Sequence, residues 1–281
     1  MTVLGRLPLS WFHRAGNIFG GLMYVFSRRD ARRLRDNIRA AGVSSNEREY
    51  RELLYEAIGQ TGKTAAEWVK VWFAPQAEIE RLVVESKGWQ SVEEARCDGK
   101  AIIFLMPHLG SFQLAMRFIA QRMPLTALYR PPQVRWLEPL MMAGSQRAKL
   151  SLAPTNLKGV ETLIHALRRG EAVALPPDQA PNSRGGVWAE FFGRPAYTTT
   201  LPRKLKRATG AVIFAAFAER LPRGRGFRLE IQPVASDHFD EREINRLVEA
   251  LVRRCPGQFL WSYNRYKVPR QARELKEETP R

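Results

Sequence analysis

From residue 76 onward, short apolar runs alternate with longer amphipathic segments. Apolar runs of about four to eight residues indicate buried strands, and an apolar period near 3.6 residues indicates helices that bury one face. Strands are expected at Leu82–Glu85, Ala101–Leu105, Leu125–Tyr129, Ala172–Leu175, Ala211–Ala218 and Phe227–Pro233. Helices are expected at Ser111–Arg122, Trp136–Lys149, Leu157–Arg169, Thr198–Thr209 and Glu241–Arg254. This alternation predicts an α/β fold with a central mixed sheet flanked by helices.

The beginning of the chain has a different pattern. Val3–Phe26 is apolar and aromatic, but its uncharged part, Ala15–Phe26, is shorter than the roughly 20 apolar residues that a membrane-crossing helix needs. A basic run follows, with Arg28, Arg29, Arg32, Arg33 and Arg35. We therefore expect residues 1–40 to form a membrane-associating helical segment that does not cross, and residues 41–281 to form the main domain. The alternative is a helix packed on the core with a solvated basic end.

A long helix is expected between these two parts. Ser44 and Glu47 match a capping box, in which a serine caps the helix and a glutamate three residues later reaches back to it. Apolar residues then recur at helical intervals until Pro75 ends the helix. The aromatic residues of this helix are expected in the core.

The chain is strongly basic, with 45 Lys and Arg against 28 Asp and Glu and a formal charge of +17. Anionic partners are therefore expected, and nucleic acid, acidic lipid and an acidic carrier protein all satisfy that condition. No basic tail or zinc-finger spacing accompanies the charge, which argues against nucleic acid. Cys97 and Cys255 lie far apart without metal-type spacing, so no metal site is expected.

Polar residues follow three of the expected strands. The strands that end at residues 105, 129 and 175 run into His108, Arg130 and Asp178, respectively. Ligands of such sheets bind beyond the carboxyl ends of the strands, so these side chains converge on one site if the strand directions agree. A histidine between a strand and a helix N-terminus can act as a base near neutral pH. His13 and His238 have no carboxylate at a useful spacing and are expected to be structural.

Several short motifs resemble, in order, those of the bacterial lipid A biosynthesis acyltransferases, the lauroyl/myristoyl branch of the lysophospholipid acyltransferase superfamily. They are Met-Pro-His-Leu-Gly-Ser-Phe-Gln at 106–113, Leu-Tyr-Arg-Pro at 128–131, Asn-Leu-Lys-Gly-Val at 156–160, Pro-Asp-Gln at 177–179, Gly-Val-Trp-Ala-Glu-Phe-Phe-Gly at 186–193, Thr-Thr-Thr at 198–200, and the segment 255–267. Each motif alone is weak, but together they are specific.

The resemblance implies a glycerolipid-acyltransferase-like fold with an acyltransferase domain at 41–281. It implies transfer of a fatty acyl chain from acyl carrier protein or acyl-CoA to a hydroxyl of a phosphorylated lipid A precursor, on the cytoplasmic face of the inner membrane. His108 would be the general base, Arg130 would steady the oxyanion or a lipid phosphate, and Asp178 would line the same cleft. No metal or other cofactor is needed, and no nucleic-acid partner is expected.

The candidate substrate-binding residues are Ser111, Gln179, Arg203, Gln258 and Arg265. Gln179 would line the cleft, and Arg265 could hold an acceptor phosphate through two hydrogen bonds. Arg203 lies on a basic helix face that would meet lipid headgroups or water. Ser111 lacks the G-x-S-x-G context of a nucleophile and is also a candidate helix cap.

Gln113 departs from the family pattern, in which an acid follows the histidine by five positions; we count it as catalytic by its place. A carboxylate there accepts the imidazole Nδ1–H, whereas a glutamine offers no charge; a comparable Asp-to-Asn change in serine proteases lowers turnover about 10⁴-fold. Three explanations stay open: another carboxylate, first of all Asp178, replaces the acid; Gln113 is an engineered change; or the protein is a weakened or non-catalytic relative. Tyr263 is a second departure, since many relatives have His there.

Three other functions are considered on the same residues. The nearest is acyl transfer to another lipid or glycolipid acceptor. The second is non-catalytic binding of a lipid or a carrier protein by a chain that kept the fold. The third is nucleic-acid binding, which rests on the positive charge alone.

Overall fold

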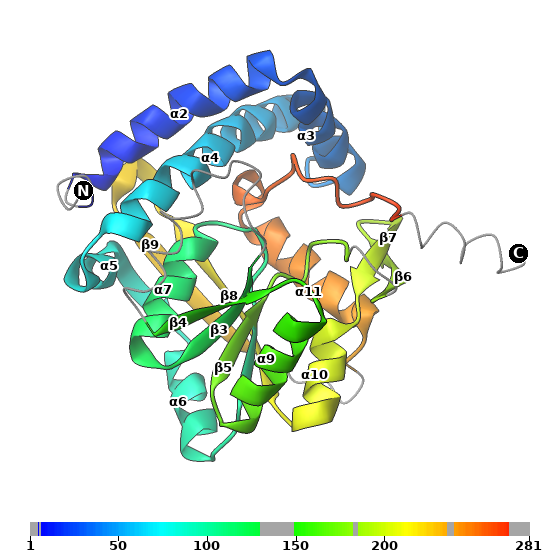
Figure 1. Cartoon of the computed structure of the whole chain (residues 1–281). Coiled ribbons are helices and arrows are strands. Elements are labelled where there is room, and N and C mark those ends of the chain that lie inside the picture. The colour runs from blue at the N-terminus through cyan, green and yellow to red at the C-terminus, as the bar shows by residue number, and fades with distance from the viewer. Residues whose placement is uncertain (1–4, 6, 130–148, 182–184, 235–238, 270–281) are drawn as a thin grey trace, which may run out of the picture.

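The computed structural model describes residue 5 and residues 7–129, 149–181, 185–234 and 239–269. A seven-stranded mixed sheet lies at the centre, in the order β1-β9-β8-β2-β5-β3-β4 (Figure 1). Its strands are β1 Val83–Lys87, β2 Ile102–Leu105, β3 Leu125–Tyr129, β4 Leu150–Pro154, β5 Ala172–Leu175, β8 Val212–Arg220 and β9 Phe227–Pro233. Within this sheet β8 and β9 are antiparallel and the other neighbours are parallel. A separate antiparallel hairpin joins β6 (Gly186–Phe191) and β7 (Arg194–Thr199).

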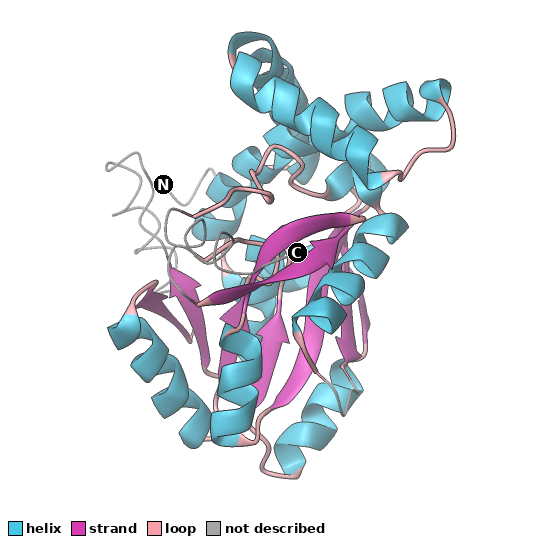
Figure 2. Cartoon of the chain, turned by 90° about the vertical axis from the view of Figure 1, so that its right-hand side faces the viewer, coloured by secondary structure: helices cyan, strands magenta, loops and turns pink. Residues whose placement is uncertain are grey.

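Helices flank the sheet on both sides, as Figure 2 shows. They are α2 Leu9–Phe26, α3 Arg28–Ala41, α4 Glu47–Phe73, α5 Gln76–Leu82, α6 Trp89–Cys97, α7 Phe112–Arg122, α9 Leu157–Arg168, α10 Leu201–Thr209 and α11 Glu241–Arg254. The predicted α/β class with a mixed sheet is confirmed. The predicted helix at 136–149 falls almost entirely outside the described residues.

Some predicted boundaries were wrong. The helix expected from Thr198 begins at Leu201, because residues 198 and 199 pair with β6 as the end of β7. The cap of α4 is Asn46 rather than Ser44: the Asn46 side chain accepts the N–H of Glu49 at 2.9 Å. The Glu49 carboxylate in turn accepts the N–H of Ser45 at 2.7 Å. The capping-box chemistry is therefore present two residues later than predicted, since Asn caps a helix as well as Ser does.

Helices α2 and α4 lie side by side and approach each other through glycines (Figure 1). A Cβ atom at Gly62 would overlap the carbonyl oxygen of Gly16, and one at Gly20 would overlap the carbonyl oxygen of Ile58. The two backbones are thus in contact. The outward side of α2 keeps large apolar side chains exposed, namely Trp11, Ile18, Phe19, Leu22, Met23, Val25 and Phe26.

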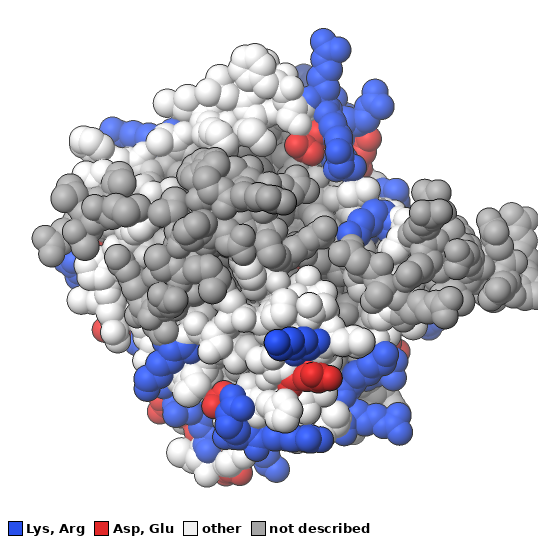
Figure 3. All heavy atoms as spheres, viewed as in Figure 1, with Lys and Arg blue, Asp and Glu red and all other residues white. Residues whose placement is uncertain are grey.

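The surface over α2 is largely uncharged, with basic side chains near its end toward α3 (Figure 3). None of the described helices combines the length and the apolar character that crossing a bilayer requires.

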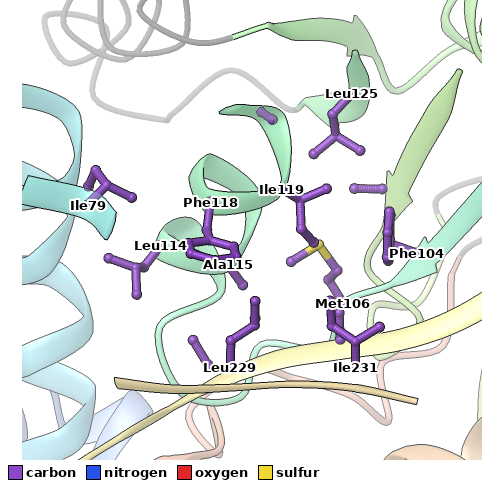
Figure 4. Close-up of a cluster of buried hydrophobic side chains, with 14 of the residues drawn as sticks. Ile79, Phe104, Met106, Leu114, Ala115, Phe118, Ile119, Leu125, Leu229 and Ile231 are labelled. Atoms are coloured by element: carbon purple, nitrogen blue, oxygen red, sulfur yellow. The ribbon is translucent and has the colours of Figure 1, made fainter. Parts of the chain in front are cut away.

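The buried side chains of the sheet divide between its two faces. Ile102 and Phe104 of β2 contribute to a cluster with α5, α6 and α7, whereas Ile103 and Leu105 contribute to a cluster with α9, α10 and α11. Figure 4 shows the first cluster, in which Leu114, Phe118 and Ile119 of α7 lie among side chains of α5 and of the sheet. Burying each such side chain contributes about 1.5–3 kcal/mol, which fixes α7 and the loop that precedes it.

The glycine contact between α2 and α4 predicts a selective loss of stability. We expect Gly62→Ala to lower the free energy of unfolding by about 1–3 kcal/mol or more, because the new methyl group overlaps the Gly16 backbone. Gly21→Ala is the control, since its Cβ would meet no described atom within 4 Å. The control should leave stability unchanged or raise it by up to about 1 kcal/mol through helix propensity. Equal effects in urea unfolding would contradict the close packing.

Candidate active site

The register of two neighbouring parallel strands brings the predicted polar residues together. Strand β2 pairs with β5 so that Leu105 lies opposite Leu175. His108 and Asp178 are each the third residue after this pair, so equal lengths of chain carry them past the edge of the sheet. Strand β3 also runs parallel to β5, so the three predicted strand directions agree. Arg130, which follows β3, lies outside the described residues.

The His108 imidazole contacts the Asp178 carboxylate. Its Nδ1 lies 3.0 Å from Oδ1 and 3.2 Å from Oδ2, and the backbone N–H of His108 donates to Oδ2 at 2.9 Å. Burial alone would raise the pKa of Asp178, but the electrostatic attraction and hydrogen bonds of His108 outweigh it and hold this pKa below its usual value. An ionised Asp178 accepts from a proton-bearing Nδ1, so Nε2 is the ring nitrogen that can act as a base when the ring is neutral.

Gln179 lies at the other side of the ring. Its side-chain nitrogen is 3.1 Å from Nε2 of His108, so the amide can donate to the basic nitrogen. The His108 side chain is 15% exposed, which leaves it reachable from outside. The Nε2 atom of His108 thus lies against the Gln179 amide, in a ring that is partly reachable from outside.

Gln113 does not take the place that the family pattern gives to an acid. It is the second residue of α7 and lines the same cavity as His108, whereas Nδ1 of His108 contacts Asp178. In the described structure, the hydrogen bond expected from position 113 is made by Asp178. Of the three explanations for Gln113, this geometry agrees with a substitute carboxylate.

The loop of His108 is held by the C-terminal part of the chain. The N–H of Leu260 donates to the carbonyl of His108 at 3.0 Å, and Leu109 forms a bridge with Phe259. Gly110 has a φ of +60°, and a Cβ there would overlap the carbonyl oxygen of Ala218. Glycine is thus required by both the backbone angle and the close approach.

The loop of Asp178 has its own support. The hydroxyl of Tyr263 accepts the N–H of Ala180 at 3.1 Å, two residues beyond Asp178. The tyrosine that departs from the histidine of many relatives therefore holds the loop that carries the carboxylate. Sequence reasoning missed this contact because 83 residues separate the two partners.

An apolar cavity of about 500 Å³ adjoins the histidine. His108, Gln113 and Gln179 are among its lining residues. Its apolar lining comes from α2, α4, α7 and the strands β3 and β4, and includes Phe19, Met23, Trp68, Trp72, Phe112, Met116, Ala127, Leu150 and Leu152. Trp72 is buried, as expected of a core residue, and both Trp68 and Trp72 also line this cavity. Helical periodicity had identified their face of α4 but not what the face borders.

Two of the predicted substrate-binding residues hold backbone beside the site. Ser111 is 2% exposed and occupies the cap position of α7, with its N–H donating to the Ala218 carbonyl at 2.8 Å. The Gln258 amide, 8% exposed, bonds to both backbone groups of Arg220, at 2.8 Å to its N–H and 3.0 Å to its carbonyl. Neither is among the residues found to line the cavity.

The two predicted arginines also have protein partners. Arg203 of α10 pairs with Glu241 at 2.8 Å. Arg265 is buried, and its guanidinium donates to the Tyr197 carbonyl at 2.9 Å, to Thr198 Oγ1 at 2.7 Å and to Asn245 Oδ1 at 3.0 Å. Burial lowers the pKa of Arg265 from its usual value. The described structure does not place either side chain in the cavity lining, and their substrate roles stay predictions.

Comparison with known proteins agrees with the motifs. Residues 1–268 match the family model of the bacterial lipid A biosynthesis acyltransferases. The chain is 26% identical over 273 residues to the lipid A biosynthesis lauroyltransferase of Escherichia coli (strain K12), covering 94% of this chain and 87% of that one. It is 26% identical over 270 residues to the palmitoleoyltransferase of the same organism, with the same coverage. It is 27% identical over 192 residues to the myristoyltransferase, covering 63% and 57%.

The chain therefore belongs to the bacterial lipid A biosynthesis acyltransferase family. It is an acyltransferase of lipid A and lipopolysaccharide biosynthesis, as the resemblance predicted.

Proposed function

We propose that this acyltransferase moves a fatty acyl chain from acyl carrier protein or acyl-CoA to a hydroxyl of a lipid A precursor, with His108 as general base. The main support for this proposal is the contact between His108 and Asp178. Nδ1 of His108 lies 3.0 Å from Oδ1 of Asp178, which leaves Nε2 available for a substrate, and His108 lines an apolar cavity. A base must lie within hydrogen-bond reach of the proton that it removes, and the cavity provides the place for such a substrate.

His108 and Asp178 suffice for a balanced reaction. Nε2 of His108 takes the proton of the acceptor hydroxyl while the hydroxyl oxygen forms a bond to the thioester carbonyl carbon. The tetrahedral intermediate then collapses, the carbon–sulfur bond breaks, and the imidazolium returns the proton to the leaving thiolate. Asp178 holds the required tautomer and stabilises the imidazolium by its charge. In this scheme the acceptor hydroxyl displaces the Gln179 amide from Nε2.

The other predicted catalytic residues have narrower support. We place Gln113 beside the reacting groups as a neutral cavity residue rather than as the partner of the imidazole. Arg130 keeps its proposed role at the oxyanion or a lipid phosphate on the family resemblance alone. The proposal needs no metal, and the part of the chain that the structure describes has no cluster of three or more His, Cys, Asp or Glu residues suited to one.

The cavity supports an acyl-chain site. Its lining is mostly aliphatic and aromatic, with aromatic side chains from α4 and α7 and leucines from β4. Each methylene that leaves water for such surroundings contributes about 0.8 kcal/mol, so an extended alkyl tail is the ligand class that this lining favours. The thioester carbonyl of a chain held there would lie on the side of His108.

We expect His108→Ala to abolish acyl transfer and Asp178→Asn to lower kcat about 10²–10⁴-fold, because the asparagine loses the charge and allows the wrong tautomer. Gln113→Glu should change kcat less than about tenfold, because Asp178 already occupies Nδ1. The measurement is transfer from an acyl carrier protein thioester to a lipid A precursor, followed by mass spectrometry of the product. His165→Ala, at an exposed histidine of α9, is the matched control and should retain activity.

Distinct results would contradict distinct parts of this proposal. Full activity of His108→Ala would contradict the assignment of His108 as the general base. Normal activity of Asp178→Asn, together with a large gain of activity in Gln113→Glu, would show that the carboxylate partner of the imidazole belongs at position 113 rather than 178. Wild-type protein that binds both substrates without transfer supports the non-catalytic alternative, and a product on a different acceptor supports the alternative acceptor.

We further propose that residues 1–40 attach the enzyme to the cytoplasmic face of the inner membrane. The apolar face of α2 is strongly exposed, with Ile18 and Val25 at 68% and Phe26 at 81%. Exposed apolar patches of this kind mark interaction sites. The basic residues of α3 begin directly after it, and each adds about 1 kcal/mol near an anionic leaflet. Phe19 and Met23 of α2 also line the cavity, so a lipid substrate would reach the cavity from the membrane side.

The membrane proposal predicts that Ile18→Glu combined with Phe26→Glu weakens binding to phosphatidylglycerol-containing vesicles by at least about tenfold, because two apolar contacts are replaced by charges repelled from the anionic surface. Val84→Glu, at a 55% exposed position of β1, is the control. Vesicle co-sedimentation measures both. Unchanged binding of the α2 variant would contradict the attachment surface.

A further inference from the structure

A buried arginine touches the loop of His108 without reaching the cavity. Arg220, the last residue of β8, is 3% exposed. Its Nη2 donates to the carbonyl of Gly110 at 2.8 Å and to Thr64 Oγ1 at 2.7 Å. Gly110 is two residues beyond His108, so this guanidinium holds the carbonyl at the far side of the loop.

A buried carboxylate fixes the arginine. Glu67 of α4 is 1% exposed, and its Oε1 lies 2.6 Å from Nε of Arg220 and 2.7 Å from Nε2 of His13 on α2. Burial would raise the pKa of Glu67, but the charge of Arg220 and the hydrogen bonds of both partners outweigh it and keep this pKa below its usual value. The carboxylate is therefore ionised and joins α2, α4 and β8 at one point.

The backbone of Gly110 is held on both sides by the same group of residues. Its carbonyl accepts from Arg220, and its N–H donates to the carbonyl of Gln258 at 3.1 Å. The Gln258 side chain is bonded to both backbone groups of Arg220. Arg220 thus acts on Gly110 directly through its side chain and indirectly through Gln258.

Stability alone does not account for this arrangement. Replacing a buried ion pair by well-packed apolar side chains is often neutral or stabilising, so the pair is weak evidence for a stabilising role. What an arginine supplies is its planar fork of donors, which here serves Glu67, Thr64 and Gly110 at once. A lysine has a single charged centre and cannot reproduce that geometry.

We propose that Arg220, fixed by Glu67, is a positioning residue for the acyl-transfer reaction. It sets the place of Gly110 and, through the two intervening peptide bonds of the loop, the place of His108 against Asp178. Arg220 does not touch the substrate. The inference rests on the proposed role of His108 as base.

Arg220→Lys tests the inference, because it keeps a positive charge beside Glu67 and removes the fork. We expect kcat to fall about 10–100-fold with KM for donor and acceptor changed less than about threefold, since a displacement near 1 Å can cost about 10² in rate while the cavity lining is intact. Lys70→Met is the matched control. Lys70 is a fully buried cation on the same helix as Glu67, and it bonds to Gly5, Leu7 and Glu78 rather than to the His108 loop. The Lys70→Met variant should have a lower melting temperature, yet its kcat should stay within about threefold of the wild-type value.

Unchanged kcat in Arg220→Lys would overturn the inference, as would an equal loss of kcat in Lys70→Met. If Arg220→Lys does not fold, Glu67→Gln decides, since it keeps the acceptor and removes the charge that fixes Arg220. In folded Glu67→Gln the same kcat-specific loss, of at least about fivefold, supports the inference, and wild-type kcat refutes it. His108→Ala, measured alongside, separates failure of the base assignment from failure of the positioning role. If His108→Ala is active, the base assignment is refuted. If His108→Ala is inactive while Arg220→Lys has normal activity, only the positioning role of Arg220 is refuted.

Discussion

The hydrogen-bonded pair of His108 and Asp178 depends on the register of two hydrophobic strands. All four residues of β2 and all four of β5 are buried, so the core determines how these strands align. A slip of one residue would turn every side chain of a strand to the opposite face, which makes the register costly to change. Because equal lengths of chain follow the aligned ends, the packing of apolar side chains decides that an imidazole meets a carboxylate.

The helical layer formed by α2 and α4 connects the surface of the protein with this pair. The glycine contact brings the two backbones together, and side chains of both helices line the cavity beside His108. The outward side of α2 carries the exposed apolar residues, while His13 on its inward side contacts Glu67. One pair of helices thus borders solvent, the cavity and the buried contacts behind the loop of His108. In the proposed function, the same layer receives the lipid and supports the base.

The sequence predicted best those features that follow from continuous apolar runs. The bounds of β3, β5 and β9 agree with the expected residues, and the convergence of His108 and Asp178 followed from the rule for strand ends. Strand β4 was missed because only Ala153 of its five residues is buried, so its apolar signal is short. The hairpin of β6 and β7 was noticed as a motif but not as a pair of strands.

Contacts between distant segments could not be predicted from spacing. His13 was expected to have no useful carboxylate, yet Glu67, 54 residues later, bonds to it. Arg220 reaches Glu67 across 153 residues, and no local pattern distinguishes it from the many other arginines of this basic chain. The assignment of Asp178 rather than position 113 to the imidazole needed the geometry as well, since the motif alone left three explanations open.

A crystal structure of the enzyme with a non-hydrolysable thioether analogue of its acyl donor would test the central claim most directly. The account predicts that the alkyl chain fills the cavity lined by α4, α7 and β4. It also predicts that the carbon equivalent to the thioester carbonyl leaves room for one hydroxyl oxygen, about 3 Å from that carbon and about 3 Å from Nε2 of His108. A chain bound outside this cavity, or a carbonyl position too far from His108 for one bridging oxygen, would contradict it.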